Sequence, residues 1–442
     1  MYKIIADNNL INTCNLSDWL FEYKNSIMPL RVKLSDYYDG LNQIVKQNAV
    51  QGRPNYSINV NMAKYITDVA TGYTFGKPVS YSVLDDSSKN LLNSVLEINK
   101  ANYTDELDYH LGGDMSVFGI AYQLVYADSK AKFPVKYKRL DPIKTFFVSD
   151  NTIEENSICA VYFHDYKENK QAKTKVYVWD ENYIYLFKGN NYSLELYSKT
   201  PHYMGQIPVI QSLNNDDAYG DYRMILDLLD SLNLMISNNT DDLQSISNAI
   251  LAVTGGKLGE EEIKQINQYK VANLPIGANM EWVIKNSNVE GVLGQIKHLL
   301  NFIFQISMVP DLSDDAFAGN LSGVAMQFKM WGIDQLWMSK IRKYKTCLHK
   351  RLKLAFRILG ISEEEADKLQ INFYRNLPEN MAQDYEIAKN LSNVLSLKTI
   401  LKNLSIVEDA DAEYKAIKEE KKNLSIKGQD KEENGEEVVA EN

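Results

Sequence analysis

Three long stretches of the chain repeat apolar residues at every third or fourth position. They cover 221–251, 288–308 and 322–359, and this spacing is typical of amphipathic helices. Pro310 is expected to end the second helix and Gly360 the third. A helix of about 30 residues is about 45 Å long, which is long for a compact domain. We therefore expect part of the apolar surface of these helices to be buried against neighbouring subunits.

The first two hundred residues mix helical and strand-like patterns. Helical periodicity covers 18–47, 60–74 and 101–110, and Pro29 is expected to divide the first of these stretches into two helices. Strand-like runs occupy 79–83, 119–126 and much of 157–210. Within the last region, Gly189-Asn190-Asn191 predicts a hairpin. The pattern predicts an α+β, mainly helical protein with a small, mostly antiparallel sheet.

The other segments are short or charged. A mixed insert over 255–284 contains the acidic turn Glu260-Glu261-Glu262 and a strand-like run at 281–284. Shorter helices are expected over 363–369 and 382–404. From residue 408 onward, acids outnumber lysines and large apolar residues are few. We therefore expect a charged tail that is disordered over 428–442.

Composition and charge narrow the class of protein. The 442 residues carry 48 Lys and Arg against 58 Asp and Glu, a net charge of −10, and 45% are hydrophobic. This length predicts roughly two to four structural units, and the acidic balance argues against a simple nucleic-acid coat. Three scattered cysteines, Cys14, Cys159 and Cys347, suggest a reducing compartment rather than a disulfide framework. We see no secretory signal and no apolar run of about 20 residues, so we expect no membrane association.

No enzyme signature is complete. Gly255-Gly256-Lys257 resembles part of a phosphate-binding loop, but the motif needs glycine at 251 and Ser or Thr at 258, and both positions are leucine. The five histidines are dispersed. Adjacent carboxylates, which are common in turns and caps but could also hold Mg²⁺, occur at Asp85-Asp86, Asp216-Asp217, Asp241-Asp242 and Asp314-Asp315. We predict no catalytic residue, metal or cofactor, and the alternative is a metal-dependent nuclease with an unrecognised site.

The helix expected over 288–308 has two distinct faces. Val289, Val292, Ile296, Leu299 and Ile303 are among the residues that share its apolar face. A polar stripe recurs at helical spacing on another face and consists of Glu290, Lys297, Asn301 and Gln305. This stripe is either an ordinary solvated face or the lining of a water-filled passage.

Basic residues gather on the helix expected over 322–359. No acid occurs between Gln335 and Ile361. The basic face consists of Arg342, Lys343, Lys350, Lys353 and Arg357, and Lys340, Lys345 and Arg351 add to it. In a chain of net charge −10, such a face could contact phosphates or an acidic neighbour. The alternatives are a solvated face and pairing with the acidic tail.

Several short sequences occur in a recognisable order along nearly the whole chain. The first are Tyr37-Tyr38-Asp39-Gly40 and Thr71-Gly72-Tyr73-Thr74-Phe75-Gly76-Lys77-Pro78-Val79. They are followed by Leu140-Asp141-Pro142, Gly205-Gln206-Ile207-Pro208-Val209, Leu229-Asp230-Ser231-Leu232-Asn233, the loop 310–325 and Asn376-Leu377-Pro378. No single sequence is decisive, but in this order they resemble the SPP1-type portal proteins of tailed bacteriophages.

The resemblance implies a ring, usually of about twelve subunits, around a tunnel for double-stranded DNA at one vertex of the capsid. It implies a conduit for DNA packaging and ejection and a docking platform for terminase and the head-tail adaptor. The other implied partners are the major capsid and scaffolding proteins. The implied location is the virion, with assembly in the host cytoplasm. The alternative is a ring-forming scaffold unrelated to virions.

The resemblance also divides the chain into parts. These are a wing (1–212), a first stem helix (213–253), a clip (254–286), a second stem helix (287–309), a tunnel loop (310–321), a long helix of the wing and crown base (322–360), a crown (361–420) and a charged tail (421–442). The implied tunnel loop faces the DNA with Asp311, Leu312, Ser313, Asp314, Asp315, Ala316, Phe317, Ala318, Gly319 and Asn320. The implied docking residues of the clip are Glu260, Glu261, Glu262 and Trp282. The polar stripe defined above is then the channel lining of the second stem helix.

Overall fold

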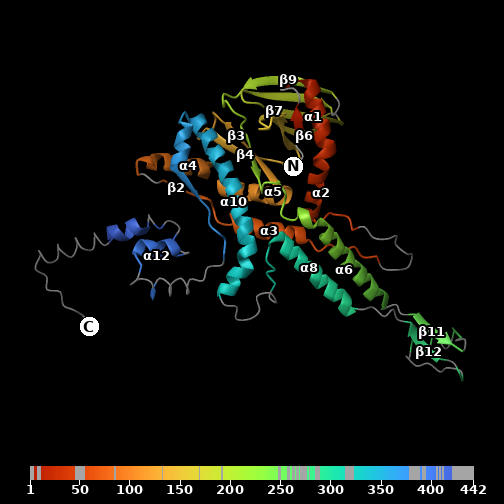
Figure 1. Ribbon diagram of the computed structural model, residues 1–442. Helices are drawn as coiled ribbons and strands as arrows, with labels where there is room; N and C mark the ends of the chain where they lie inside the picture. Colours follow the sequence, from red (N-terminus) through yellow and green to blue (C-terminus); the bar gives the residue numbers. More distant parts are fainter. Residues whose placement is uncertain are drawn as a thin grey trace, which may run out of the picture. The chain divides into compact units, whose positions relative to one another are not determined.

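The computed structural model divides the chain into two units, 1–376 and 377–442. The residues it describes are 4–6, 11–44, 55–83, 86–131, 133–168, 170–190, 193–246, 250–255, 259–260, 264, 268, 276–277, 279–283, 289–313, 323–377, 389–390, 395–404, 407, 410 and 413–420. The first unit combines helices with four sheets (Figure 1). The mixed helix and sheet composition that the sequence predicts is therefore present.

A six-stranded sheet forms the first core. Its strand order is β1 (Ile4–Ala6), β5 (Thr145–Asp150), β6 (Ser157–Glu168), β7 (Gln171–Trp179), β8 (Tyr183–Asn190) and β9 (Ser193–Pro201). β1 is parallel to β5, and the remaining pairs are antiparallel. The ladder of β8 and β9 closes at the pair Asn190 and Ser193, which confirms the predicted hairpin.

Two helices follow β1, and the first covers one face of this sheet (Figure 1). α1 (Thr13–Ser26) buries Trp19 and Tyr23 in the same core as Phe187 of β8. α2 (Met28–Asp39) carries Pro29 in its first turn, where the missing N–H leaves no helical bond unmade. Gly40 ends α2 with a φ of 72°, a conformation that favours glycine. The predicted division of the helical stretch at Pro29 is confirmed.

The second core lies around a three-stranded sheet in the order β10 (Val209–Leu213), β3 (Ile120–Ala127) and β4 (Val135–Leu140). The helices that contribute to it or pack beside it are α3 (Met62–Phe75), α4 (Lys89–Ala101), α5 (Thr104–Phe118) and α10 (Gly323–Leu359). α4 was not predicted, and α5 extends beyond the helix expected over 101–110. α10 buries Tyr344, Leu348 and Phe356 in this core.

Two helices pack side by side next to α3. α6 (Leu226–Ile246) follows the short helix η2 (Arg223–Ile225), and α8 (Val289–Ser307) lies against α6 (Figure 1). The prediction of one helix over 221–251 was wrong at both ends. After Ile246 the chain forms β11 (Ile250–Thr254), which pairs with β12 (Asn279–Val283) in an antiparallel ladder. The β-branched residues of β11 favour a strand over another helical turn.

A second correction concerns residues 363–372. The helix predicted over 363–369 is the short 3₁₀ helix η3 (Glu363–Lys368), and it leads into β13 (Leu369–Asn372), which pairs with β2 (Ser80–Val83). In the second unit, α12 (Leu397–Asn403) lies within the helix predicted over 382–404. The expectation of a disordered stretch at 428–442 falls outside the described residues. No helix among the described residues is long and apolar enough to cross a membrane.

Candidate functional site

The polar stripe of α8 is exposed along its length. The side chains of Glu290, Lys297, Asn301 and Gln305 are all exposed in the isolated chain. On the opposite side, the fully buried Ile303 shares a core with Leu232 of α6. The helix therefore has the two faces that its sequence predicts, and the role of the stripe as a channel lining stays a prediction.

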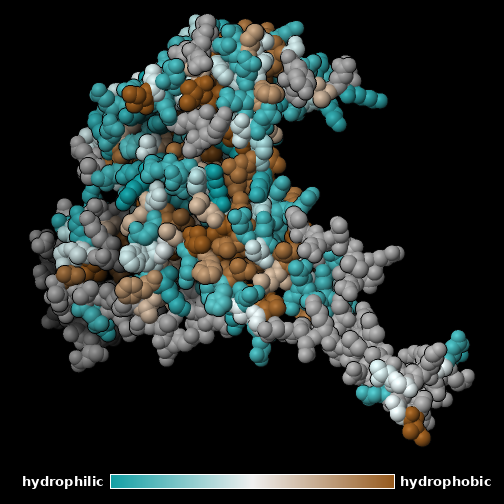
Figure 2. Space-filling view, turned by 45° about the vertical axis from the view of Figure 1, so that its right-hand side comes forward, coloured by the Kyte–Doolittle hydropathy of each residue, from teal (hydrophilic) through white to brown (hydrophobic). Residues whose placement is uncertain are grey.

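α8 also has an exposed apolar edge. Phe302 and Ile306 lie one turn apart and are 51% and 50% exposed. They lie roughly 100° around the helix from Asn301 and Gln305 of the polar stripe. At the start of α10, Phe328 and Trp331 are exposed as well. The space-filling view shows that hydrophobic side chains gather in a patch on the displayed face (Figure 2). Apolar patches of this kind commonly mark protein interfaces.

An extended segment, residues 55–60, is bound along α6. Alternate backbone N–H groups donate to polar side chains spaced four residues apart on the helix: Val60 to Asn233 at 2.8 Å, Ile58 to Ser237 at 2.9 Å and Tyr56 to Asp241 at 2.7 Å. Two residues of an extended chain advance about 6.6 Å and four residues of a helix about 6 Å, so the two repeats match. The sequence analysis missed this contact. Polar residues such as Ser237 and Asp241 interrupt the apolar pattern of α6, and this interruption is the signal that could have indicated it.

The end of α8 is fixed to α3 by one tyrosine. The Tyr65 hydroxyl donates to the carbonyl oxygen of Pro310 at 2.9 Å and accepts from the backbone N–H of Leu312 at 3.0 Å. Burial raises the pKa of Tyr65, against the effect of the Leu312 N–H. Of the predicted tunnel loop, the structure describes Asp311, Leu312 and Ser313, and the seven residues from 314 to 320 lie outside it. Tyr65 thus holds the first residues of this loop.

Two of the basic residues on α10 are buried and form ion pairs. The Lys340 ammonium is fully buried, and it lies 2.6 Å from the Asp221 carboxylate and 2.6 Å from the Ser116 hydroxyl. Burial lowers the pKa of Lys340, and the Asp221 carboxylate opposes the shift. Arg351 donates to both carboxylate oxygens of Asp108, at 2.5 and 3.0 Å. The expectation that Lys340 and Arg351 extend an exposed basic zone was therefore wrong, because their acidic partners come from other elements.

The five residues of the predicted basic face fall into two groups. Three of them form ion pairs with acids from other segments: Lys343 with Asp216, Lys353 with Asp367 and Arg357 with Glu363. Arg342 and Lys350 are exposed, and neither has an acidic partner within the part of the chain that the structure describes. Sequence reasoning missed the three partners because none of them lies on α10.

β12 lies within the predicted clip (254–286), and its Trp282 stands opposite Leu251 of β11. All of β11 except Thr254 falls in the segment predicted as the first stem helix (213–253). Glu260 is exposed, whereas Glu261 and Glu262 lie outside the described residues. The docking role of these residues stays a prediction.

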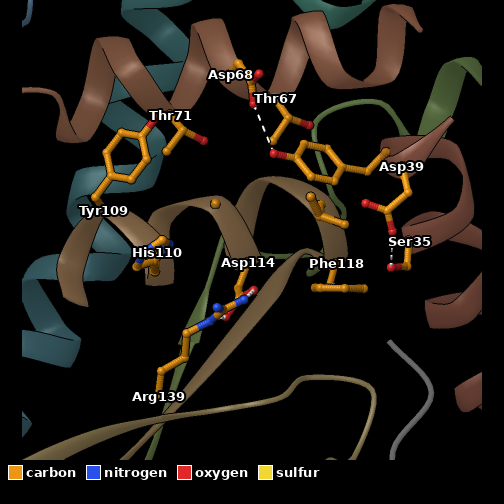
Figure 3. A pocket seen from close by; sticks show the side chains of 13 residues that line it. Ser35, Asp39, Thr67, Asp68, Thr71, Tyr109, His110, Asp114, Phe118 and Arg139 are labelled. Carbon is orange, nitrogen blue, oxygen red and sulfur yellow. Dashed lines mark hydrogen bonds and ion pairs between the residues drawn. The ribbon is translucent and has the colours of Figure 1, made fainter. Parts of the chain in front are cut away.

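A cavity of about 260 Å³ lies between α2, α3 and α5 (Figure 3). Asp114 in its wall is 3% exposed and accepts hydrogen bonds from Arg139 at 2.6 and 2.5 Å. Burial raises the pKa of Asp114 to about 6, although the Arg139 guanidinium opposes the shift. At the same cavity, Tyr38 donates to Asp68 at 3.1 Å. These polar groups bind one another, which favours a structural role.

No three His, Cys, Asp or Glu side chains come together in a way that could hold a metal ion, as far as the described residues go. Asp216, which belongs to one of the adjacent carboxylate pairs considered for Mg²⁺, forms an ion pair with Lys343. Asp314 and Asp315 lie outside the described residues. A nuclease role for that last pair stays an alternative for experiment.

Comparisons with known proteins agree over most of the chain. A family model described as "Phage portal protein, SPP1 Gp6-like" matches residues 19–427. The portal protein of Clostridium phage phiCD119 is 24% identical over 423 residues, which cover 88% of this chain and 92% of that protein. The portal protein of Bacillus phage SPP1 is 21% identical over 417 residues, covering 88% and 80%. A solved structure, the neck of an empty GTA particle computed with C6 symmetry, aligns with a TM-score of 0.48 and 12% identity, over 77% of this chain and 88% of that one.

Proposed function

Because the chain belongs to the SPP1 Gp6-like family of phage portal proteins, we propose that it forms a ring of about twelve subunits at one vertex of the capsid. Phage portal proteins are structural proteins of the virion and not enzymes. The ring is the conduit for packaging and ejecting double-stranded DNA. The observation that carries this proposal is the match of the family model over residues 19–427.

The two exposed faces of α8 support an arrangement of subunits around a bore. The apolar edge with Phe302 and Ile306 suits contact with a neighbouring subunit, since side chains of this size are stabilised when water is excluded from them. The polar stripe lies about 100° away on the same helix and suits a water-filled channel. The two faces of α8 would then contact a second subunit and line the hydrated channel.

The charge of the chain suits a sleeve through which DNA moves. A net charge of −10 per subunit disfavours tight binding of phosphates, and charge effects between exposed groups are screened beyond about 8 Å in physiological salt. Lys297, which is exposed in the polar stripe, offers a local and reversible contact. The absence of a complete phosphate-binding loop from the sequence is consistent with ATP hydrolysis by a separate terminase.

The tunnel loop, Asp311 to Asn320, is proposed to form the narrowest part of the channel. Tyr65 holds Pro310 and Leu312, so the loop starts from a fixed position beside α3. Gly319 and Gly323 flank its far end in the sequence, and glycine allows backbone conformations that other residues avoid.

Docking is proposed at the clip and the wing. Glu260, Glu261, Glu262 and Trp282 would contact terminase during packaging and the head-tail adaptor afterwards. The wing would contact the major capsid and scaffolding proteins. Assembly would take place in the host cytoplasm before the ring becomes part of the virion. Of the basic face, Arg342 and Lys350 are available for such contacts, while Lys343, Lys353 and Arg357 already bind acids of their own subunit.

The mass of the purified particle and its top view test this proposal. Sedimentation velocity should give a single large species, and negative-stain images should show a ring with a central hole. A compact monomer, or an assembly closed along its axis, would overturn it. Deleting Ala316 to Gly319 should leave ring formation intact and abolish stable packaging. Normal DNA-filled heads from this variant would remove the loop from the proposed channel.

A further inference from the structure

A groove of about 330 Å³ runs between α10 and β13. One wall consists of Ile341, Arg342 and Lys345 of α10, and the other of the consecutive residues 371–374. Neighbouring residues of an extended chain point to opposite sides, so four in succession reach the same groove only along the edge of the chain. Among the described strands, β13 is hydrogen-bonded to β2 alone. Ile371 and Asn372 end β13, and Phe373 and Tyr374 follow it, so the groove lies along the second edge at the end of this strand.

The α10 wall of the groove is positively charged. Arg342 and Lys345 are one turn apart and both exposed, and no acidic side chain of the described residues pairs with either. Elsewhere on the same helix, Lys343 and Arg357 do have such partners. In a chain of net charge −10, this groove keeps two cations available for a ligand.

Apart from Asn372, the remaining surface of the groove is apolar or aromatic. Ile341 is half-buried on the helix side, and Ile371 and Phe373 lie on the strand side. Ile371 is 3% exposed and belongs to the second core, so packing in that core holds this part of the groove in place. The groove thus combines a strand edge, a pair of cations and apolar contacts.

We propose that this groove binds an extended, acidic peptide segment of a partner protein, which adds as a strand to the edge of β13. The backbone of the segment would exchange hydrogen bonds with β13, which is a recurrent mode of peptide recognition. Its acidic side chains would reach Arg342 and Lys345, and the residues between them would face the apolar surface. The inference concerns a single subunit and does not require that the chain form a ring.

The geometry favours a peptide over DNA. A strand edge presents alternating N–H and C=O groups that match another peptide backbone, whereas phosphates accept hydrogen bonds and donate none. DNA contact depends on many basic residues along a surface, and this groove has two. The apolar wall would also gain nothing from a phosphate backbone.

Fluorescence anisotropy with the full chain tests the proposal. The probe is a fluorescein-labelled eight-residue peptide that alternates valine and glutamate. It should bind, and the substitution Lys345→Glu should weaken binding by about fivefold or more, since one favourable charge contact becomes repulsive. The matched control is Lys138→Glu, which makes the same change at an exposed lysine of β4 outside the groove. It should change the affinity by less than about twofold.

Two further probes separate the parts of the proposal. The same peptide with N-methyl groups on alternate backbone nitrogens keeps its charges but loses the N–H groups for strand addition, and it should bind much more weakly. A peptide with lysine in place of glutamate should not bind. Equal affinity of the methylated peptide would overturn strand addition, and equal affinity of the Lys345→Glu variant would overturn the site.

Other occupants give different outcomes. If the valine–glutamate peptide bound only after removal of residues 421–442, the occupant would be this chain's own tail and the partner assignment would be wrong. If a short DNA duplex bound and lost affinity in the Lys345→Glu variant while the peptide did not bind, the groove would recognise phosphates. Either result would overturn the proposal.

Discussion

The side-chain oxygen of Asn233 on α6 accepts a 2.8 Å hydrogen bond from the backbone N–H of Val60, a residue of the extended segment 55–60. The amide nitrogen of the same side chain donates to Asn59 at 3.0 Å. Asn233 is 2% exposed, so these bonds form away from water. One asparagine thereby joins α6 to a part of the chain that precedes it by more than a hundred residues.

Replacing Asn233 with alanine should lower the free energy of unfolding by about 1–3 kcal/mol, because the Val60 N–H loses its partner. Urea unfolding measures this loss. The matched control is Asn238→Ala, the same change at an exposed position of α6, which should stay within about 0.5 kcal/mol of the parent. Similar losses in both variants would show that the buried bond does not account for the effect, because alanine favours a helix more than asparagine does.

Lys340→Met should lower the free energy of unfolding by about 3–5 kcal/mol, because it leaves the buried Asp221 carboxylate without its cation. The double variant Lys340→Met with Asp221→Asn should recover part of that loss, since no uncompensated charge remains. Chemical denaturation of both variants and of Asp221→Asn completes the cycle. A double variant whose loss equals the sum of the two single losses would show that the two side chains are not coupled.

Asp114, which pairs with Arg139, should make the free energy of unfolding depend on pH. The pKa of Asp114 is about 6 in the folded chain, above about 3.9 for an unfolded aspartate. Between these values the native state binds more protons than the unfolded chain, so the free energy of unfolding falls as the pH rises. The contribution lost from about pH 4 to pH 7 is about 2–3 kcal/mol.

Asp114→Asn removes this titration. As the pH rises from about 4 to 7, the free energy of unfolding of the parent should therefore fall relative to that of the variant. Unfolding curves at several pH values measure it. In Arg139→Met the opposing guanidinium is lost, so the pKa of Asp114 should rise further and the decline should continue to higher pH. A parent–variant difference that is constant with pH would show that Asp114 keeps an ordinary pKa.

Phe302→Asp should prevent assembly if the apolar edge of α8 contacts a neighbouring subunit, because a carboxylate there would have to be buried without a partner. Sedimentation velocity should then show mainly single subunits that unfold at the parental temperature. Asn301→Asp adds the same carboxylate one residue earlier, on the polar stripe, and should leave the assembly intact. If Asn301→Asp lost assembly and Phe302→Asp did not, the polar stripe rather than the apolar edge would contact the neighbouring subunit.

The sequence predicted elements whose signals are local. The bounds of α8 and α10 differ from the predicted helices by one residue at most, because their apolar periodicity and the stop signals Pro310 and Gly360 lie within the helices or next to them. The division at Pro29 and the hairpin at Gly189-Asn190-Asn191 follow from the same kind of information.

Features that depend on distant partners could not be predicted in the same way. β13 has only four residues, too few for a reliable strand pattern, and its partner β2 lies far earlier in the sequence. Lys340 and Arg351 look like solvated bases in the sequence, and only Asp221 and Asp108 make their burial possible. Within the candidate site, the polar stripe of α8 was visible as a pattern, whereas the acids that pair with three of the five residues of the basic face were not.

The buried ion pairs at Lys340 and Arg351 fix α10 at two points that are 11 residues, or about 16 Å, apart along its axis. The nearly five turns before Lys340 extend beyond the first of these points and connect to the segment that follows α8. A displacement at Gly323 would therefore pass through the first turns of α10 to the ion pair of Lys340 with Asp221, while Arg351 holds the later part of the helix in place. Movement at the start of α10 would then reach Asp221, at the entrance to α6, without any change in the helix itself.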